Sequence, residues 1–459
     1  MQKVIVSITL FLVTLGGFAQ QKENYSFNLE EAISFAIDSN YTAINARRDI
    51  AKALQQKWET TATGLPQVSG AVSYNNNLRQ PVSLIPAEFN GGPPGTFVPI
   101  TFGTKQNANA TATLNQLIFD GSYLVGLKAA KSFLRFSENT TEKTRLEVRK
   151  GVINAYGSIL LSEELVAIFE KNKSALEKNL FETKQIYDNG LTEEESVEQL
   201  EVTLLDLDTQ LNNAKRSNSI ARQMFNLALG IDVNTPVILR DTMDGLILQN
   251  QSLSLLNNEL SLEENVDYKI ALNLTEQRDL EMQLEKSAAL PSLSAFVNYA
   301  TTANSDSFSF LDSEQIWYQS SLLGLSLKVP IFSSGMRNAK TKRAKIALNQ
   351  AETQLEETSQ QVTLQLNTAR SNYQFAIEKY ENAKKNIALS ERIENKNQVK
   401  FTEGLSTSFD LRQAQTQLYS AQQQYFQSML DLINAKAEIE TVLNIPELRI
   451  TSDQVKNQQ

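Results

Sequence analysis

The sequence predicts a mixed fold in which long α-helical coiled-coil hairpins are combined with transmembrane β-strands, in a duplicated chain. Three observations carry this prediction. Short landmarks recur in the same order in both halves of the chain, and small or apolar residues follow a heptad-like spacing over long segments. In addition, apolar and polar residues alternate in segments of about ten residues, the length of a membrane strand.

The composition excludes most catalytic chemistry. The chain has 459 residues with no histidine and no cysteine, so it offers no imidazole base, no Cys-His nucleophile pair and no ordinary zinc, haem or iron–sulfur site. We therefore expect neither an enzyme nor a bound cofactor. The formal net charge is -9, from 43 basic and 52 acidic side chains. That balance argues against nucleic acid as a partner, because phosphates require a basic surface.

Residues 1–19 have the pattern of a secretory signal peptide. Lys3 precedes an apolar run, and Gly17-Phe18-Ala19 is a small-x-small processing site. The alternative, an N-terminal membrane anchor, is disfavoured because the run is shorter than the ~20 apolar residues of a spanning helix. No later apolar run is expected to reach that length. A membrane contact would then involve strands or a surface.

Four landmarks recur between the two halves. They are Leu65-Pro66 with Leu290-Pro291, Ile118-Phe119 with Ile331-Phe332, Tyr187-Asp188-Asn189-Gly190-Leu191-Thr192 with Phe401-Thr402-Glu403-Gly404-Leu405-Ser406, and Leu229-Gly230-Ile231 with Leu443-Asn444-Ile445. The last two pairs share an offset of 214 positions. The chain is therefore divided into a signal peptide at 1–19, a first repeat at 20–231, a linker at 232–261, a second repeat at 262–447 and a C-terminal tail at 448–459.

Each repeat is expected to begin with a helix, over 28–63 and over 262–289, that ends at a Leu-Pro pair because proline stops a helix. Two strands follow. Segments 107–119 and 317–331 alternate between an apolar and a polar face, and residues 69–74 and 293–299 are predicted to be their shorter partners.

Loop 76–105 connects the first two strands. It holds half of the ten prolines in the chain and is predicted to be exposed and irregular.

Long helices follow the strands. Between Ala344 and Ile387, thirteen small or apolar positions are spaced by four and three in alternation, with two successive fours at Val362. This spacing predicts a coiled-coil seam with one stutter. A helix over 335–401 would be about 100 Å long at 1.5 Å per residue, and its partner over 408–443 would return after a turn. A plain two-stranded coiled coil is the alternative for these helices.

Alternating segments with one apolar face are typical of transmembrane barrel strands. Aromatic residues near the segment ends, such as Tyr74, Phe119 and Trp317, suit a membrane interface. One chain offers four such strands, an open sheet edge cannot persist in lipid, and known barrels have at least eight strands. Two or more chains would then pool their strands. The alternative is the edge of a soluble β-sandwich.

In the duplicated order of its motifs the chain resembles the TolC-type outer-membrane efflux proteins. The resemblance extends from Phe27-Asn28-Leu29-Glu30-Glu31-Ala32 to Leu443-Asn444-Ile445-Pro446. It implies a homotrimer, with a twelve-stranded barrel in outer-membrane lipid and an α-helical tunnel that extends into the periplasm. It also implies a periplasmic adaptor, or membrane fusion protein, that joins the tunnel to an inner-membrane pump.

The resemblance assigns candidate residues at the ends of the two hairpins. Its tip motif, which docks the adaptor, matches two Gly-Leu turns: Gly190, Leu191 and Thr192, and Gly404, Leu405 and Ser406. The glycines also fit a plain helix cap, since a left-handed residue commonly ends a helix.

The resemblance further assigns an aperture. Asp410 matches an acidic ring, and the second position of that ring is Gln413 here. Tyr187 and Asp188 match latch positions, Phe401 is the counterpart of Tyr187 in the second repeat, and Ser406 stands where a latch arginine is common. Glu193, Glu194 and Glu195 are expected to supply acidic charge at the aperture, or only to complement a helix N-terminus.

Together these observations predict a passive outer-membrane channel of a tripartite efflux or type I secretion system, with no catalytic, cofactor or metal site. The alternative is a periplasmic coiled-coil adaptor or scaffold. An adaptor would have one hairpin flanked by Gly/Val-rich β-modules, whereas this chain has two hairpins and lacks those modules.

Overall fold

The structure of the protein is a computed structural model that describes residues 25–250, 253–257 and 261–445. The expected signal peptide, the expected tail and part of the linker lie outside these residues. The chain divides into two compact units. The first unit comprises residues 1–48, 139–269 and 358–459, and the second comprises 49–138 and 270–357. Each unit thus draws on both halves of the sequence.

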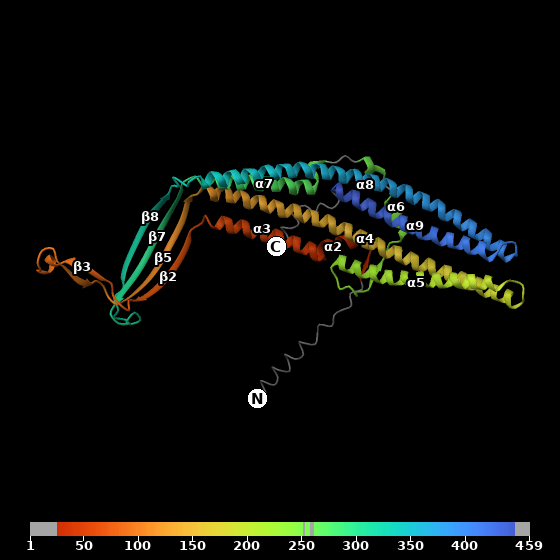
Figure 1. The fold of residues 1–459 in the computed structure, drawn as a ribbon, viewed down its shortest axis with the longest axis horizontal. Coiled ribbons are helices and arrows are strands. Elements are labelled where there is room, and N and C mark those ends of the chain that lie inside the picture. The colour runs from red at the N-terminus through yellow and green to blue at the C-terminus, as the bar shows by residue number, and fades with distance from the viewer. Residues whose placement is uncertain (1–24, 251–252, 258–260, 446–459) are drawn as a thin grey trace, which may run out of the picture. The chain divides into compact units, whose positions relative to one another are not determined.

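The second unit is built on a four-stranded antiparallel sheet (Figure 1). Its strand order is β2 (Gln67–Asn76), β5 (Gln106–Phe119), β7 (Ser292–Ser305) and β8 (Tyr318–Lys328). The prediction that β2 and β7 are the shorter strands is wrong for β7, which has 14 residues because it pairs with β5 and β8 along its two sides. β8 ends before the expected 331, since Pro330 cannot donate to a ladder.

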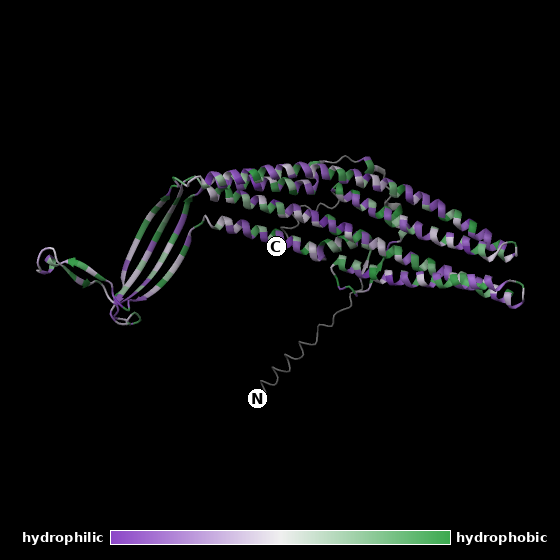
Figure 2. Ribbon diagram, in the orientation of Figure 1, coloured by the Kyte–Doolittle hydropathy of each residue, from purple (hydrophilic) through white to green (hydrophobic). Residues whose placement is uncertain are grey.

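The register gives the sheet one apolar face. Val68 lies opposite Leu114, Leu114 lies opposite Val297, and Val297 lies opposite Leu323. Val68 and Leu323 are 72% and 74% exposed. The alternation that the sequence predicts therefore extends as one apolar surface across all four strands, and Figure 2 shows its green and purple bands along the strands.

The opposite face of the sheet is polar and is joined by side-chain hydrogen bonds. The Asn75 amide donates to Asn107, and the Asn107 amide donates to Asn304. The Asn298 amide donates to the Thr113 hydroxyl at 2.8 Å. These amides and hydroxyls have partners on the neighbouring strands, so this face is suited to water.

Segment 76–105 is more regular than its prolines predict. It contains an antiparallel hairpin of β3 (Val82–Pro86) and β4 (Phe97–Thr101), with a 3₁₀ turn at Ala87–Asn90 between them. A two-stranded ribbon consists only of edge strands, where the missing N–H of Pro86 or Pro99 is tolerated. The prediction of an irregular loop was therefore wrong.

The first unit contains two helical hairpins (Figure 1). They are formed by α4 (Gly121–Asp188) with α5 (Glu194–Leu229), and by α8 (Met336–Thr402) with α9 (Ser408–Val442). Both α4 and α8 begin in the second unit. Of the thirteen seam positions predicted between Ala344 and Ile387, eight are buried and none is exposed. The predicted seam is therefore confirmed.

The opening helix expected over 28–63 is two helices, α2 (Leu29–Ser39) and α3 (Tyr41–Ala62). Asn40 separates them with an extended backbone, and its side-chain oxygen accepts a hydrogen bond from the Thr42 N–H at 2.8 Å. Its amide nitrogen donates to the Ala228 carbonyl of α5. Asn40 thus caps α3 while it contacts a distant helix.

Except for β1, which precedes α2, the remaining elements lie between the two hairpins in the sequence. They are β1 (Tyr25–Phe27), β6 (Val237–Leu239), α6 (Met243–Asn250), 3₁₀ turns at Leu253–Asn257 and Leu262–Glu264, and α7 (Val266–Ser287). β1 and β6 form a parallel pair that the sequence analysis did not predict. The second opening helix, expected over 262–289, therefore begins as a 3₁₀ turn and continues as α7.

The main core of the first unit gathers residues from α2, α4, α5, α8 and α9, among them the fully buried Tyr156, Phe225 and Tyr373. Within α4, one 18-residue stretch is strongly apolar, and half of it is buried inside the protein. This stretch has the length and composition of a membrane-crossing helix, but it is not an uninterrupted apolar run. A buried core helix has the same composition.

Candidate functional site

The first candidate tip is the turn between α4 and α5. Gly190 has a φ of 73°, and its N–H donates to the Tyr187 carbonyl at 2.7 Å. The Leu191 N–H donates to the Ile186 carbonyl at 3.1 Å. This pair of bonds is the Schellman arrangement, which satisfies the last carbonyls of a helix.

The second candidate tip, between α8 and α9, has the same backbone. Gly404 has a φ of 71°, and its N–H donates to the Phe401 carbonyl at 3.0 Å. The Leu405 N–H donates to the Lys400 carbonyl at 2.7 Å. A Cβ atom added at either glycine would have no neighbouring side chain or backbone atom within 4 Å. Glycine is therefore favoured there by the left-handed backbone and not by close packing.

Each turn presents a leucine to the surroundings. Leu191 is 78% exposed and Leu405 is 73% exposed, although the N–H of each is bonded to a helix carbonyl. Thr192 and Ser406 come next and are only partly exposed. The six candidate docking residues therefore form two similar protrusions.

The two tips differ in how the next helix begins. Thr407 is the N-cap of α9, and its hydroxyl accepts the Asp410 N–H at 3.1 Å while the Asp410 carboxylate accepts the Thr407 N–H at 3.1 Å. This reciprocal pair is a capping box. The Ser406 hydroxyl also donates to Asp410, at 3.2 Å. The pattern Thr-x-x-Asp could have been recognised in the sequence.

Asp410 is exposed and charged at neutral pH. The hydrogen bonds from Thr407, first its side chain and then its backbone, hold the pKa of Asp410 below the ordinary value, and Ser406 and nearby Lys400 act in the same direction. An aperture built from three copies of this residue would carry fixed negative charge.

α5 begins without a capping box. Glu193 is at the N-cap and makes no side-chain capping bond, and Ser196 occupies the position that corresponds to Asp410. Glu194 and Glu195 lie in the first turn, where acidic side chains complement the partial positive charge of a helix N-terminus.

The latch candidates lie at the ends of α4 and α8. Tyr187 and Asp188 are exposed, and Phe401 is partly buried. In the described part of the chain the side chains of Tyr187 and Asp188 form no hydrogen bond or ion pair, so the structure does not bond them to Ser406. The backbone carbonyls of Tyr187 and Phe401 instead accept the glycine N–H groups.

Neutral polar side chains join the two hairpins near the tips. The Ser408 hydroxyl donates to the Ser196 hydroxyl at 3.1 Å. Deeper in the hairpins, the amides of Asn179 and Gln398 exchange hydrogen bonds at 2.9 and 3.3 Å. The Asn172 amide donates to Gln422 at 2.8 Å in a buried pair. The sequence analysis identified none of these residues.

Ion pairs between the two hairpins occur only away from the tips in the described residues. Arg149 of α4 pairs with Glu440 of α9 at 2.5 Å, and Lys150 pairs with Glu438. Closer to the tips, Lys173 pairs with Asp208 within the first hairpin. The tip ends of the two hairpins are therefore held to each other by bonds between uncharged groups.

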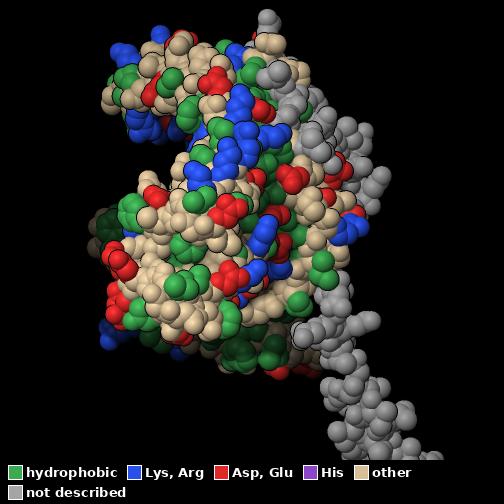
Figure 3. All heavy atoms as spheres, turned by 90° about the vertical axis from the view of Figure 1, so that its right-hand side faces the viewer, with side chains coloured by type: hydrophobic (Ala, Val, Ile, Leu, Met, Phe, Trp, Pro, Cys, Tyr) green, Lys and Arg blue, Asp and Glu red, His purple; other side chains and the backbone are tan. Residues whose placement is uncertain are grey.

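A groove of about 710 Å³ runs between α5 and α9 near the tips. Its lining is mostly polar and includes Gln413, the neutral residue expected at the acidic ring. Phe409 is half exposed there, and the Arg412 guanidinium lies 5.3 Å from the centre of its ring. The sequence analysis overlooked both. Figure 3, which faces the tips, shows hydrophobic side chains interspersed with charged ones.

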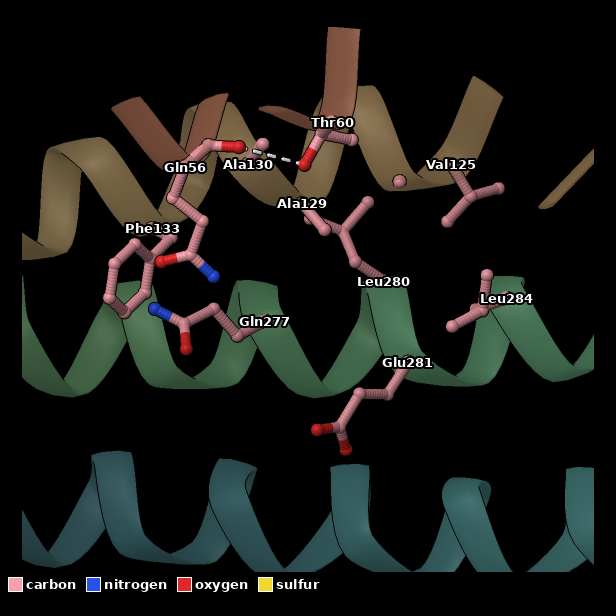
Figure 4. Close-up of a pocket in the computed structure, with 11 residues that line it drawn as sticks. Gln56, Thr60, Val125, Ala129, Ala130, Phe133, Gln277, Leu280, Glu281 and Leu284 are labelled. Carbon is pink, nitrogen blue, oxygen red and sulfur yellow. Dashed lines mark hydrogen bonds between the residues drawn. The ribbon is translucent and has the colours of Figure 1, made fainter. Parts of the chain in front are cut away.

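The second unit has a smaller pocket of about 290 Å³ among α3, α4 and α7 (Figure 4). The side chains of Gln56 and Gln277 point toward each other there beside Phe133. The Gln277 amide nitrogen is buried without a hydrogen-bond partner. The rest of the lining is mostly small or aliphatic, and Glu281 is its one acid. No cluster that could hold a metal ion occurs among the described residues.

Comparisons with known proteins agree with this architecture. A family model described as outer membrane efflux protein matches residues 33–231 and 259–444. The outer membrane protein TolC of Vibrio cholerae serotype O1 is 23% identical to this chain over 339 residues, which are 71% of this chain and 74% of that protein.

Solved structures with the same fold are also outer-membrane channels. The Campylobacter jejuni CmeC channel has a TM-score of 0.74 at 16% identity, and the match covers 97% of this chain and 94% of that one. The open state of the Neisseria gonorrhoeae MtrE channel has a TM-score of 0.70 at 16% identity, and covers 91% and 88%. At these identities the likeness establishes the fold.

Proposed function

Because the chain belongs to the outer membrane efflux protein family, and is therefore an outer-membrane transport channel and not an enzyme, we propose that three copies form one passive export duct. The sheets of the three copies close into a twelve-stranded barrel in the outer membrane. The hairpins form the periplasmic part of a tripartite efflux or type I secretion system, and an adaptor connects them to an inner-membrane pump.

The main support for a shared membrane barrel is the four-stranded sheet, which has one apolar and one polar face. Its apolar face is exposed across four strands, as a lipid-facing surface requires. Its edge strands β2 and β8 each have one unpaired side, which lipid does not tolerate. In an antiparallel order of four strands, β2 and β8 run in opposite directions, so β8 of one copy can pair with β2 of the next.

The proposed contact with the periplasmic adaptor lies at the two tips. Gly190 and Gly404 turn the chain so that Leu191 and Leu405 protrude, and two exposed leucines on hydrogen-bonded turns suit an apolar contact with an adaptor. Thr192 and Ser406 add hydrogen-bonding groups beside them.

The aperture is proposed to open by an iris-like movement of the second hairpin against the first. The links that must break near the tips are hydrogen bonds between neutral groups, such as Ser408 with Ser196, and each contributes only about 0.5–1.5 kcal/mol. Asp410 supplies a charged ring, which favours cations in the pore, and Gln413 leaves the next position uncharged.

Single-channel recording in planar bilayers tests this function. Wild-type protein should form pores with cation preference. Asp410→Asn removes the charge but keeps an oxygen that can accept the cap hydrogen bonds, so it should lower the preference for cations without loss of the pore. Glu314→Gln, the same change in the β7–β8 connection, is the control and should have no such effect. Absence of any pore would refute the proposal.

The docking contact needs a separate test in cells that export a substrate of the complex. Leu191→Ser combined with Leu405→Ser should reduce export, while conductance of the purified protein stays unchanged. Leu364→Ser, at a leucine of α8 that is 65% exposed, is the matched control. Normal export by the double variant would contradict docking at the tips.

A further inference from the structure

The first turns of α8 carry an unusual charge. Residues 315–351 contain six cations and no acid, in a chain whose net charge is -9. Five of the six follow one another closely at the start of the helix: Arg337, Lys340, Lys342, Arg343 and Lys345. The whole segment belongs to the second unit, which also holds the sheet.

Most of these cations have little interaction inside the protein, although Arg337 is partly buried and donates to the Ile331 carbonyl at 3.4 Å. Lys340, Lys342 and Lys345 are exposed and form no ion pair in the described residues. Arg343 reaches Glu285 only at 3.9 Å, with its side chain 79% exposed. Packing and internal ion pairs therefore do not account for the cluster.

The cluster also opposes the stability of its own helix. The N-terminus of a helix carries partial positive charge, so cations in the first turns are unfavourable. α4 also follows a strand of the sheet. It is preceded by Asp120, whose carboxylate accepts the N–H groups of Ser122 and Tyr123 at 2.7 and 3.0 Å. α8 has no acid in its first turn. An external anion would offset the charge that α8 leaves uncompensated.

The residues just before the cluster are apolar and exposed. Ile331 is 89% exposed, Phe332 is 85% exposed and Met336 is 57% exposed, and all three lie between the end of β8 and the second turn of α8. Exposed apolar side chains followed at once by cations are the pattern of a segment that lies at the surface of an anionic bilayer.

We infer that residues 329–345 form a binding surface for anionic phospholipid headgroups of the periplasmic leaflet. The apolar residues enter the acyl region, and the lysines and Arg343 contact the phosphates. This inference rests on the proposed function, because it requires that the sheet lies in the outer membrane. The helices leave the sheet on the periplasmic side, so the lipids are glycerophospholipids of that leaflet.

The test compares phosphatidylglycerol with phosphatidylcholine as lipids that bind to the detergent-solubilised full chain, counted by native mass spectrometry. Each cation at an anionic surface contributes a roughly five-fold gain in binding. The variant with Lys340→Gln, Lys342→Gln, Arg343→Gln and Lys345→Gln should therefore lose its preference for phosphatidylglycerol by about ten-fold or more. The wild-type preference should also weaken with added salt.

A matched control changes three lysines and one arginine of the same helix in the first unit: Lys384→Gln, Lys385→Gln, Arg392→Gln and Lys396→Gln. It removes the same charge and should keep the preference. Equal preference in the wild type and the α8 N-terminal variant would overturn the inference. A change in pore ion selectivity without a change in lipid preference would also overturn it, since the cations would then face the lumen.

Pore formation in phosphatidylcholine bilayers separates this inference from the proposed function. If the wild type and both variants conduct there and the lipid preference is unchanged in the α8 N-terminal variant, only the inferred lipid-binding surface is wrong. If the wild type forms no pore, the proposed function itself is wrong.

Discussion

The turns at the ends of the two helical hairpins share one backbone conformation, but the helices that follow them begin differently. Gly190 and Gly404 end their helices with nearly equal φ angles of 73° and 71° and with the same pair of hydrogen bonds. After them, α9 begins with the box of Thr407 and Asp410, whereas α5 begins with Glu193 and has no side-chain cap.

This difference distinguishes the features that both tips share from the feature that only one tip has. The left-handed glycine and the exposed leucine are common to both turns, so they belong to the shape of a tip. Of the two hairpins only the second has a capping box, and that box fixes Asp410, the residue that matches the acidic ring. A charged group that is tied to its own helix start keeps its position when the hairpin moves.

The largest expected effect comes from the amide pair that joins the two hairpins. Asn179→Leu leaves the Gln398 amide without its partner in a partly buried site, which should cost about 1–3 kcal/mol. The tip ends should separate more readily, with a larger mean conductance in planar bilayers. The double variant Asn179→Leu, Gln398→Leu removes both partners and should recover most of the stability. An additive loss in the double variant would contradict the pairing.

The next effect tests whether the two turns are equivalent. Gly190→Ala and Gly404→Ala should each destabilise the turn by about 1–2 kcal/mol, because alanine is disfavoured in the left-handed region. Hydrogen exchange of peptides across each turn measures the loss. Gly151→Ala, inside α4, should instead stabilise the helix by roughly 0.5–1 kcal/mol. If the two substitutions caused very different losses of stability, the two turns would differ in their contacts despite the same backbone conformation.

A smaller effect tests the capping box. Thr407→Ala should cost about 1 kcal/mol at the start of α9, whereas Glu193→Ala should cost little, since Glu193 makes no capping bond. Exchange rates of the first amides of α9 and α5 report the two losses. Similar losses at both sites would remove the distinction between the tips.

The smallest effect is on the titration of Asp410. Its pKa is lowered in the folded protein, so its contribution to stability is present above the ordinary aspartate pKa and is lost as pH falls through the lowered value. NMR titration should show Asp410 ionised throughout the neutral and mildly acidic range. Thr407→Ala should raise this pKa toward the ordinary value, and an unchanged pKa would mean that the capping box does not cause the shift.

Local patterns in the sequence predicted much of this molecule. The seam of α8, the alternation of the strands and both Gly-Leu turns depend on spacing within one segment, and that spacing is visible in the chain itself. The capping box of Thr407 and Asp410 is also visible as a short motif, but the sequence analysis assigned Asp410 only to an aperture.

Other features depend on residues that are far apart in the sequence. Asn40 breaks the opening helix while its amide bonds to the Ala228 carbonyl, and no local pattern contains that contact. The amides of Asn179 and Gln398 look like ordinary surface residues until the two hairpins are placed together. The prolines of 76–105 predicted an exposed, irregular loop, yet β3 and β4 pair there as a hairpin.

By itself, the sequence determined the periodic elements, since a helix seam or a strand face follows from which residues repeat along one segment. Only the tertiary structure decided that the apolar positions of four strands form one surface and that neutral amides join the hairpins. It also showed that Lys340, Lys342 and Lys345, at the start of α8, form no ion pair with the described residues. The reason is physical: hydrogen bonds and burial depend on which segments meet, and that is fixed by packing between segments that the sequence separates by up to hundreds of residues.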